Sequence, residues 1–188
     1  ERPMSRSDTI PELARKGLRL RAPVQADIAA RKTLGRVPEI TQMFGIPLGD
    51  PKPISTAEAE GWFGSLSAQP LAWVIEEQSA LIGEIRLQGH VIEDRRAEME
   101  ISILDPKKLG QGIGPRAIHL LLRHAFETMR LHRVAVRVLA SNTRAIVAFR
   151  KVGFVEEGRE RQSSKVGQKW QDDVIMGLLN AEYVGIGV

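Results

Sequence analysis

The stretch Leu109-Gly110-Gln111-Gly112-Ile113-Gly114 places a glycine at every second position. Glycine has no side chain, so a ligand can approach its backbone closely. If a helix begins at this stretch, its first N–H groups have no partner within the helix and point toward a bound anion. Three alternating glycines therefore predict an anion-binding loop. A plain strand-to-helix turn, which needs fewer glycines, remains the alternative.

The segments on both sides of this loop predict a strand before it and a helix after it. Residues 97–104 alternate apolar and polar side chains, which is typical of a strand. After the loop, apolar residues at helical spacing predict a helix that opens at about Pro115. A buried strand is predicted at 134–138, followed by a second amphipathic helix over 142–152 that ends at Gly153.

The rest of the chain predicts further strands and helices around the same sheet. Ser55 begins a capping-box pattern, so a helix should start there and end near Leu66. The Gly and Pro residues within 45–54 predict a loop, and we expect a loose or partly helical lead-in at 1–16. The other predicted elements are a helix at 24–34 and strands at 18–21, 71–76, 81–87, 154–161 and 170–179. We expect one mixed α/β domain that spans residues 1–188.

Two common phosphate-binding motifs do not fit the glycine loop. The Walker motif requires Gly-Lys followed by Ser or Thr, whereas Pro115 and Arg116 follow Gly114 here. A dinucleotide-binding fingerprint requires an acidic residue at the end of the next strand. The predicted strand at 134–138 instead leads into residues 139–142, none of which is acidic. A nucleotide kinase and a dehydrogenase are therefore both disfavoured.

The composition is that of a globular protein with a modest positive charge. The 188 residues include 27 Lys and Arg against 23 Asp and Glu, which gives a formal net charge of +4. This excess attracts anions, but the basic residues are scattered, so nucleic acid is disfavoured as a partner. The absence of cysteine excludes disulfides, thiolate metal sites and a cysteine nucleophile. It also favours a reducing compartment, and we expect a cytoplasmic protein.

The sequence predicts neither a membrane-spanning helix nor a metal site. No apolar run approaches the roughly 20 residues of a membrane-spanning helix. The polar residues 1–8 lead us to expect no signal peptide. The spacing of the four histidines is not that of metal ligands; they are His90, His119, His124 and His132.

Two segments together carry a resemblance to a known family. The glycine loop at 109–114, followed by the segment from Asn142 to Phe154, resembles the GNAT superfamily of acetyl-CoA-dependent N-acetyltransferases. The likeness spans roughly residues 18–183, and the segments at 20–23 and 172–179 are similar to the first and last strands of its RimJ/RimL-type group. This resemblance implies a central, mostly antiparallel, twisted sheet flanked by helices. Acetyl-CoA would bind in a cleft between splayed central strands.

The resemblance also implies which residues bind acetyl-CoA. The backbone of the glycine loop would hold the pyrophosphate. The pantetheine arm would pair with the strand at Ile103 and Leu104, and Asn142 would bond the amide groups of the cofactor. Asn142 is equally a typical helix N-cap, and the two roles are compatible. The complete set of expected cofactor-binding residues is Ile103, Leu104, Leu109, Gly110, Gln111, Gly112, Ile113, Gly114, Asn142, Phe149 and Lys151.

The candidate catalytic residues begin with two acids on the strand before the loop. Glu98 and Glu100 lie two residues apart, so they share a face of that strand. An ammonium group has a pKa of about 10, so a base must remove its proton before it attacks a thioester. The resemblance implies that one of these acids serves as the base, with Glu98 slightly preferred. Both could instead be solvated residues, paired with Arg86 of the neighbouring strand.

Other functional groups are less clearly indicated. The family commonly has a tyrosine that protonates the CoA thiolate at the position where this chain has Phe149. Ser141 is a candidate substitute, and water is another. Asp172 and Asp173 lie at the beginning of the last predicted strand and could hold a cationic amine, or could form only a polar strand entry.

The function that this resemblance implies is acetyl transfer from acetyl-CoA to a primary amine. Because no cysteine can carry the acetyl group, we expect direct transfer in a ternary complex without a metal. The acceptor stays open between a protein N-terminus, a polyamine, an aminoglycoside-like amine and an amino sugar, and homodimer formation stays open as well. The competing hypothesis is a CoA-binding sensor or partner module with weak or no turnover.

Overall fold

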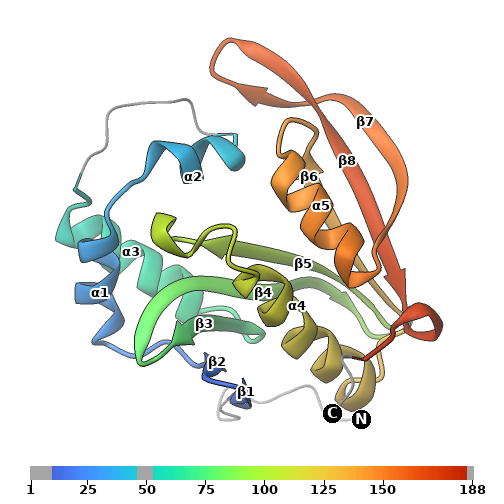
Figure 1. The fold of residues 1–188 in the computed structure, drawn as a ribbon, viewed down its shortest axis with the longest axis horizontal. Helices are drawn as coiled ribbons and strands as arrows, with labels where there is room; N and C mark the ends of the chain where they lie inside the picture. Colours follow the sequence, from blue (N-terminus) through green and yellow to red (C-terminus); the bar gives the residue numbers. More distant parts are fainter. Residues whose placement is uncertain (1–9, 46–52, 186–188) are drawn as a thin grey trace.

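The structure is a computed structural model, which describes residues 10–45 and 53–185. Its centre is a sheet of eight strands in the order β1-β2-β3-β4-β5-β6-β8-β7 (Figure 1). The strands are β1 (Leu13–Arg15), β2 (Leu18–Arg21), β3 (Ala72–Glu77), β4 (Ala80–Val91), β5 (Arg96–Ile103), β6 (Arg133–Leu139), β7 (Val155–Val166) and β8 (Lys169–Leu179). The helices are α1 (Asp27–Leu34), α2 (Pro38–Met43), α3 (Thr56–Ser67), α4 (Ile113–Arg123) and α5 (Thr143–Val152). Strands β7 and β8 extend past the other strands as a long hairpin.

The sheet is antiparallel except where β5 meets β6. These two strands run parallel and pair only over Arg96–Glu98 and Arg133–Ala135. Beyond Glu98 and Ala135 they part, whereas β5 stays paired with β4 as far as Ile103. We call this divergence the fork. The expectation of a mostly antiparallel sheet with splayed central strands is confirmed.

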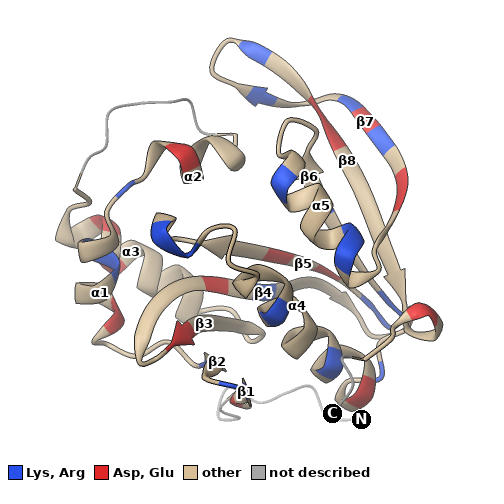
Figure 2. Cartoon of the chain, viewed as in Figure 1, with Lys and Arg blue, Asp and Glu red and all other residues tan. Residues whose placement is uncertain are grey.

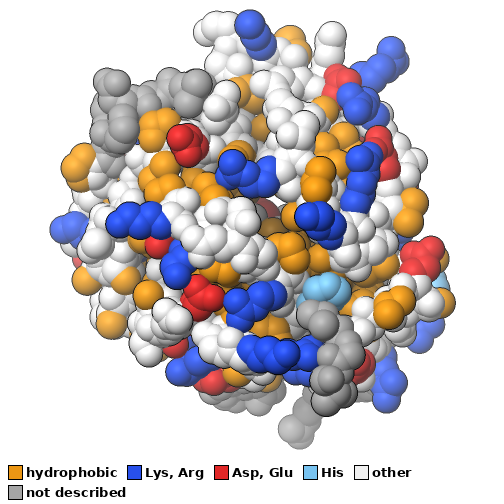
Figure 3. Space-filling model, in the orientation of Figure 1, with side chains coloured by type: hydrophobic (Ala, Val, Ile, Leu, Met, Phe, Trp, Pro, Cys, Tyr) orange, Lys and Arg blue, Asp and Glu red, His pale blue; other side chains and the backbone are white. Residues whose placement is uncertain are grey.

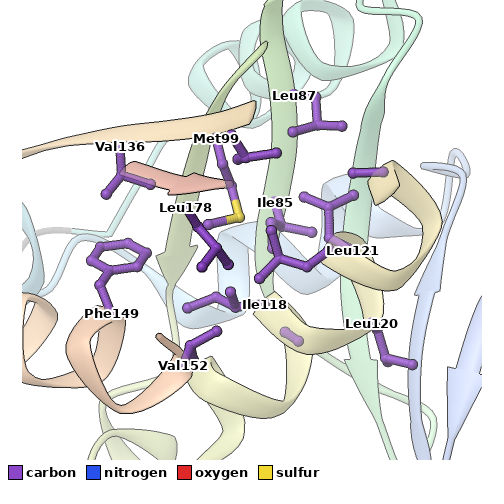
Figure 4. Close-up of a cluster of buried hydrophobic side chains, with 14 of the residues drawn as sticks. Ile85, Leu87, Met99, Ile118, Leu120, Leu121, Val136, Phe149, Val152 and Leu178 are labelled. Atoms are coloured by element: carbon purple, nitrogen blue, oxygen red, sulfur yellow. The ribbon is translucent and has the colours of Figure 1, made fainter. Parts of the chain in front are cut away.

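The main core lies between the sheet and the pair of helices α4 and α5. Alternate residues of β4, β5 and β6 face these helices, as expected for strands with one buried face. Figure 4 shows Met99, Val136 and Leu178 from the strands close to Ile118 of α4 and Phe149 of α5. The other face of the sheet packs against α1 and α3 through a smaller cluster that includes Leu66 and Val74.

Local signals in the sequence set most helix ends. Ser55 and Glu58 form the predicted capping box at the start of α3. Gly153 ends α5 in a left-handed conformation, with φ of 114°, as expected for a glycine C-cap. Helix α4 begins at Ile113, two residues earlier than predicted, and continues into a π-helical turn at His124–Thr128.

Two short elements differ from the sequence prediction. The lead-in at 1–16 includes the strand β1, which pairs with β2 across a tight turn at Lys16 and Gly17. Helix α2 was not predicted at all, because six residues are too few to show a helical period. The predicted loop at 45–54 lies mostly outside the described residues. Within the described parts of the chain, no helix combines the length and the apolar character needed to cross a bilayer.

Candidate functional site

A cavity of about 640 Å³ opens beside the fork. Helix α2, the end of β5, the glycine loop with the start of α4, and helix α5 form its walls. The walls are largely apolar, and three basic residues, Lys108, Arg144 and Lys151, also line the cavity. Figure 3 shows Lys and Arg side chains around the middle of this face, where the surface is hollowed. An apolar cleft with a basic lining suits a ligand that has an anionic group and a long uncharged arm.

The glycine loop forms one end of this cavity and exposes its backbone. Gly110 and Gly112 have φ of 74° and 75°, a left-handed conformation that favours glycine. A Cβ atom at Gly110, Gly112 or Gly114 would meet no atom of the described residues within 4 Å, so the backbone is open on this side. No side chain caps the start of α4. The first N–H groups of α4 are therefore available to an anion in the cavity, as the loop sequence predicted.

Asn142 caps α5 and also bridges two walls of the cavity. Its Oδ1 accepts a hydrogen bond from the backbone N–H of Ala145 at 3.1 Å, which is an N-cap. Its Nδ2 donates to the carbonyl oxygen of Met43 in α2 at 3.4 Å. The N-cap interpretation is confirmed. Its predicted contact with a cofactor stays a prediction, although Asn142 lines the cavity.

Phe149 belongs both to the cavity wall and to the core. Its side chain is buried, and its ring lies 5.4 Å from that of Phe154 in an edge contact. The only tyrosine of the chain, Tyr183, lies elsewhere and donates a hydrogen bond to the carbonyl oxygen of His119. Tyr183 therefore does not replace the hydroxyl that Phe149 lacks. Among the remaining predicted cofactor residues, Ile103, Leu109, Ile113 and Lys151 line the cavity, whereas Leu104 and Gln111 do not.

The two candidate bases lie on the opposite face of β5. Met99 faces the core below α4, so Glu98 and Glu100 point to the other side of the sheet. Glu100 accepts hydrogen bonds from the Arg86 guanidinium at 2.5 and 3.3 Å, which confirms the predicted pairing for this residue. Glu98 is exposed and belongs to the last residue pair before β5 and β6 diverge. Of the two acids, only Glu98 lies at the fork without an ion pair among the described residues.

The residues predicted from the last strand already have partners. Asp173 is buried, and it accepts hydrogen bonds from Arg137 at 2.7 and 2.9 Å and from Ser163 and Ser164 at 2.7 and 2.6 Å. Burial alone would raise the pKa of Asp173, but these hydrogen bonds outweigh it and hold the pKa below its usual value. The Asp173 carboxylate therefore joins β8 to β6 and to the end of β7.

Neither Asp172 nor Ser141 lines the cavity. One Asp172 oxygen accepts a hydrogen bond from the backbone N–H of Gln162 at 2.9 Å. The Ser141 hydroxyl donates to Gln171 at 2.7 Å and is exposed.

One acid on the same face as Glu98 was not predicted from the sequence. Glu84 of β4 is half-buried beneath α3, and the indole N–H of Trp62 donates to its carboxylate. Burial raises the pKa of Glu84. The available signal was an acid within the otherwise apolar segment 81–87. Together with its neighbours this acid forms a set that we call the charged row: Glu84, Arg86, Glu98, Glu100, Arg137 and Asp173. Figure 2 shows acidic residues on β4, β5 and β8.

Comparisons with known proteins agree with this geometry. A model of the acetyltransferase (GNAT) domain matches residues 17–155. The spermidine N(1)-acetyltransferase of Vibrio cholerae is 30% identical over 113 residues, which cover 60% of this chain and 65% of that protein. The Escherichia coli K12 enzyme of the same name is 29% identical over 108 residues, or 57% of this chain and 56% of that protein. The chain thus spans roughly half to two thirds of these relatives.

A solved structure matches more of the chain. The Vibrio cholerae spermidine N-acetyltransferase in complex with CoA and spermine superposes with a TM-score of 0.74 at 26% identity, and the match covers 89% of this chain and 98% of that one. An acetyltransferase of the GNAT family from Bacillus anthracis has the same fold, with a TM-score of 0.78 at 16% identity. The fork, the glycine loop and the match to the family model lead to one conclusion: the chain belongs to the GNAT acetyltransferase domain family.

Proposed function

We propose that this protein is an acetyl-CoA-dependent N-acetyltransferase that acts on a primary amine, with residues 1–188 working as one catalytic domain. The observation that carries the proposal is the fork, which opens onto a cavity whose end is the exposed glycine loop. Acetyl transfer requires a thioester and an amine to meet within one site. A divided sheet lets them approach from its two faces.

The described residues fit a CoA-like molecule. The open backbone at Gly110 and Gly112 suits a pyrophosphate, and Lys108, Arg144 and Lys151 supply further positive charge. Past the fork, the edge of β5 toward β6 has no partner among the described strands, so its backbone groups near Ile103 can pair with the amides of an extended arm. Bound acetyl-CoA would supply the activated acetyl group. The chain would orient it and exclude water around the apolar wall at Phe149.

Glu98 is the acid best placed to act as the base. It stands at the fork, and within residues 10–45 and 53–185 no ion pair holds it, whereas Glu100 is bonded to Arg86. In this role Glu98 accepts a proton from the acceptor ammonium, directly or through a water molecule, and leaves a neutral amine. Ser141 is a weaker candidate for protonating the departing thiolate because its hydroxyl already donates to Gln171. A thiolate has a pKa of about 8.5, so water can take this role.

Among the acceptors, the proposal favours a polyamine. The charged row has four carboxylates against two guanidinium groups, and its net negative charge suits a molecule with several ammonium groups. The names of the two spermidine acetyltransferases support the same choice. Asp172 remains a candidate contact for the amine, whereas the bonds of Asp173 favour a structural role. The grouping with RimJ/RimL-type enzymes rests on sequence segments alone and stays a prediction.

The test is an assay of thiol release with a panel of acceptors. The protein is mixed with acetyl-CoA and one acceptor at a time. The acceptors are spermidine, a short peptide with a free N-terminus, an aminoglycoside and glucosamine, and the acetylated product is identified by mass spectrometry. We expect the fastest CoA release with spermidine. The proposal would be refuted if no acceptor gave CoA release and calorimetry detected no binding of acetyl-CoA.

The second candidate is a CoA-binding module without turnover, and Phe149 is the observation that favours it. Its signature is tight binding of CoA by calorimetry while no acceptor in the panel is acetylated.

A further inference from the structure

A second cavity, of about 430 Å³, lies on the side of α4 that faces away from the fork. Its walls come from α4, from the turn between β1 and β2, and from the segment around Tyr183. Figure 4 shows the two sides of α4: Ile118 points toward Phe149, and Leu120 lies on the far side. Leu120 lines the second cavity, Ile118 lines the first, and no described residue lines both.

The second cavity has a positive lining. Its basic side chains are Arg15 and Lys16 from the turn and Arg116 and Arg123 from α4, against a single carboxylate, that of Glu127. Arg116 is held at 3.2 Å from Glu77 and at 2.8 Å from the carbonyl oxygen of Lys16. Within residues 10–45 and 53–185, no ion pair or hydrogen bond occupies the Arg123 guanidinium, and the same holds for the Lys16 ammonium. A concave surface with this balance of charge concentrates anions.

The same cavity has an aromatic and apolar wall. Tyr183 is half-buried, and its ring centre lies 5.2 Å from that of Phe126, which fixes the ring against the core. The backbone at His119 accepts the Tyr183 hydroxyl, and the buried Nδ1 of His119 has no hydrogen-bond partner among the described residues. The cavity therefore offers a fixed aromatic ring beside its basic side chains.

We propose that this second cavity binds a small organic anion, in which a phosphate or carboxylate group contacts Arg123 and Lys16 and a planar ring lies against Tyr183. A guanidinium binds the two oxygens of such a group in a fork geometry. The volume is within the range of small-molecule sites, about 300–1,000 Å³. This site is separate from the proposed acetyl-CoA cavity, so it would take an effector molecule or a second substrate.

The experiment uses the full chain saturated with CoA, so that the first cavity is filled. Phenyl phosphate is the probe in isothermal titration calorimetry, with inorganic phosphate and benzyl alcohol as probes of the anion and of the ring alone. We expect one phenyl phosphate per chain, bound at least tenfold more tightly than either fragment. Binding of phenyl phosphate only to the CoA-free protein would overturn the proposal, because it would place the anion in the first cavity.

Matched variants locate the binding site. Arg123→Gln and Lys16→Gln should each weaken phenyl phosphate about tenfold, as expected for the loss of one charge-assisted contact. Tyr183→Ala should weaken phenyl phosphate but leave the affinity for inorganic phosphate unchanged. Arg150→Gln, which removes an exposed charge on α5 outside both cavities, is the control and should bind as the wild type does.

The CoA affinity of every variant checks that it is folded. Should one variant fail this check, the other two carry the test. Wild-type affinity for phenyl phosphate in folded Arg123→Gln and Lys16→Gln would contradict the proposal.

Discussion

The two faces of the sheet at the fork present different chemical groups. On the side of α4 and α5, the cavity wall consists of exposed backbone at the glycine loop and of apolar side chains such as Ile101 and Phe149. On the other side lies the charged row, whose carboxylates and guanidinium groups come from β4, β5, β6 and β8. Most substitutions leave backbone N–H groups in place, whereas a single substitution removes a carboxylate. The first face is thus suited to a constant ligand, and the second can change its specificity one residue at a time.

The largest expected effect comes from removing the charge of one residue of the charged row, at the fork. Glu98→Gln keeps the size of the side chain and removes its charge, so kcat should fall on the order of a hundredfold, with little change in acetyl-CoA affinity. Glu100→Gln is the matched control, because its carboxylate is bonded to Arg86, and its effect on kcat should be smaller. A Glu98→Gln enzyme with the wild-type pH–rate profile would exclude Glu98 as the base.

The second prediction separates a structural carboxylate from a catalytic one within the same row. Asp173→Asn should lower the free energy of unfolding by about 2 kcal/mol at neutral pH, because Arg137 loses its buried charged partner and among the described residues keeps only the exposed Glu160 at 3.4 Å. The measurement is urea denaturation, with Asp172→Asn as the control, since Asp172 is less buried and has fewer partners. Equal stability of the two variants would contradict the role assigned to Asp173.

The stability contributed by Asp173 should also depend on pH. Its pKa in the folded protein is below the usual value, so the folded state favours the ionised carboxylate. The contribution is therefore complete above the pKa of the unfolded chain, about 3.9, and is lost as the pH falls through the lower folded pKa. Denaturation curves of wild type and Asp173→Asn should converge on the acid side. A difference that stays constant down to about pH 2 would contradict this.

The next prediction concerns the glycine loop, on the face of the sheet that carries α4 and α5. Gly112→Asp adds a negative charge to the open space before α4, so acetyl-CoA should bind at least tenfold more weakly, or about 1.4 kcal/mol. Gly112→Asn is the matched control, because Asn has nearly the same shape and a similar tolerance of positive φ. Calorimetry that finds equal affinities for the two variants would show that no anion binds at the loop.

The smallest expected effect concerns the apolar wall. Phe149→Tyr should raise kcat by up to about tenfold if thiolate departure limits the rate, and leave it flat if product release does. Phe149→Ala should weaken CoA binding, because it removes a ring that lines the cavity. Phe149→Leu keeps an apolar side chain in the core and serves as the control for folding. CoA affinity equal to wild type in a folded Phe149→Ala variant would remove Phe149 from the proposed site.

The same contrast explains what the sequence could predict. The glycine loop and the Asn142 cap depend on local backbone requirements, which appear as short motifs within a few residues, whereas the fork was expected only from the family resemblance. The contacts of the charged row join residues far apart in the chain, such as Trp62 to Glu84. Only the folded sheet brings these pairs together. That is why Glu84 was missed and why the sequence left open whether Asp173 contacts a substrate or only forms a polar strand entry.

The fork has a thermodynamic consequence for the protein in a living cell. Past Glu98 and Ala135, the edges of β5 and β6 that face each other have no partner among the described strands. A molecule that pairs with these edges therefore stabilises the folded state and not the unfolded chain. At a concentration one hundred times its dissociation constant, such a ligand adds about 2.7 kcal/mol to the free energy of unfolding. If the fork binds acetyl-CoA as proposed, free CoA would stabilise the protein as well, because both molecules carry the same pyrophosphate and pantetheine arm. Resistance to heat and to proteases would then follow the total supply of CoA and acetyl-CoA.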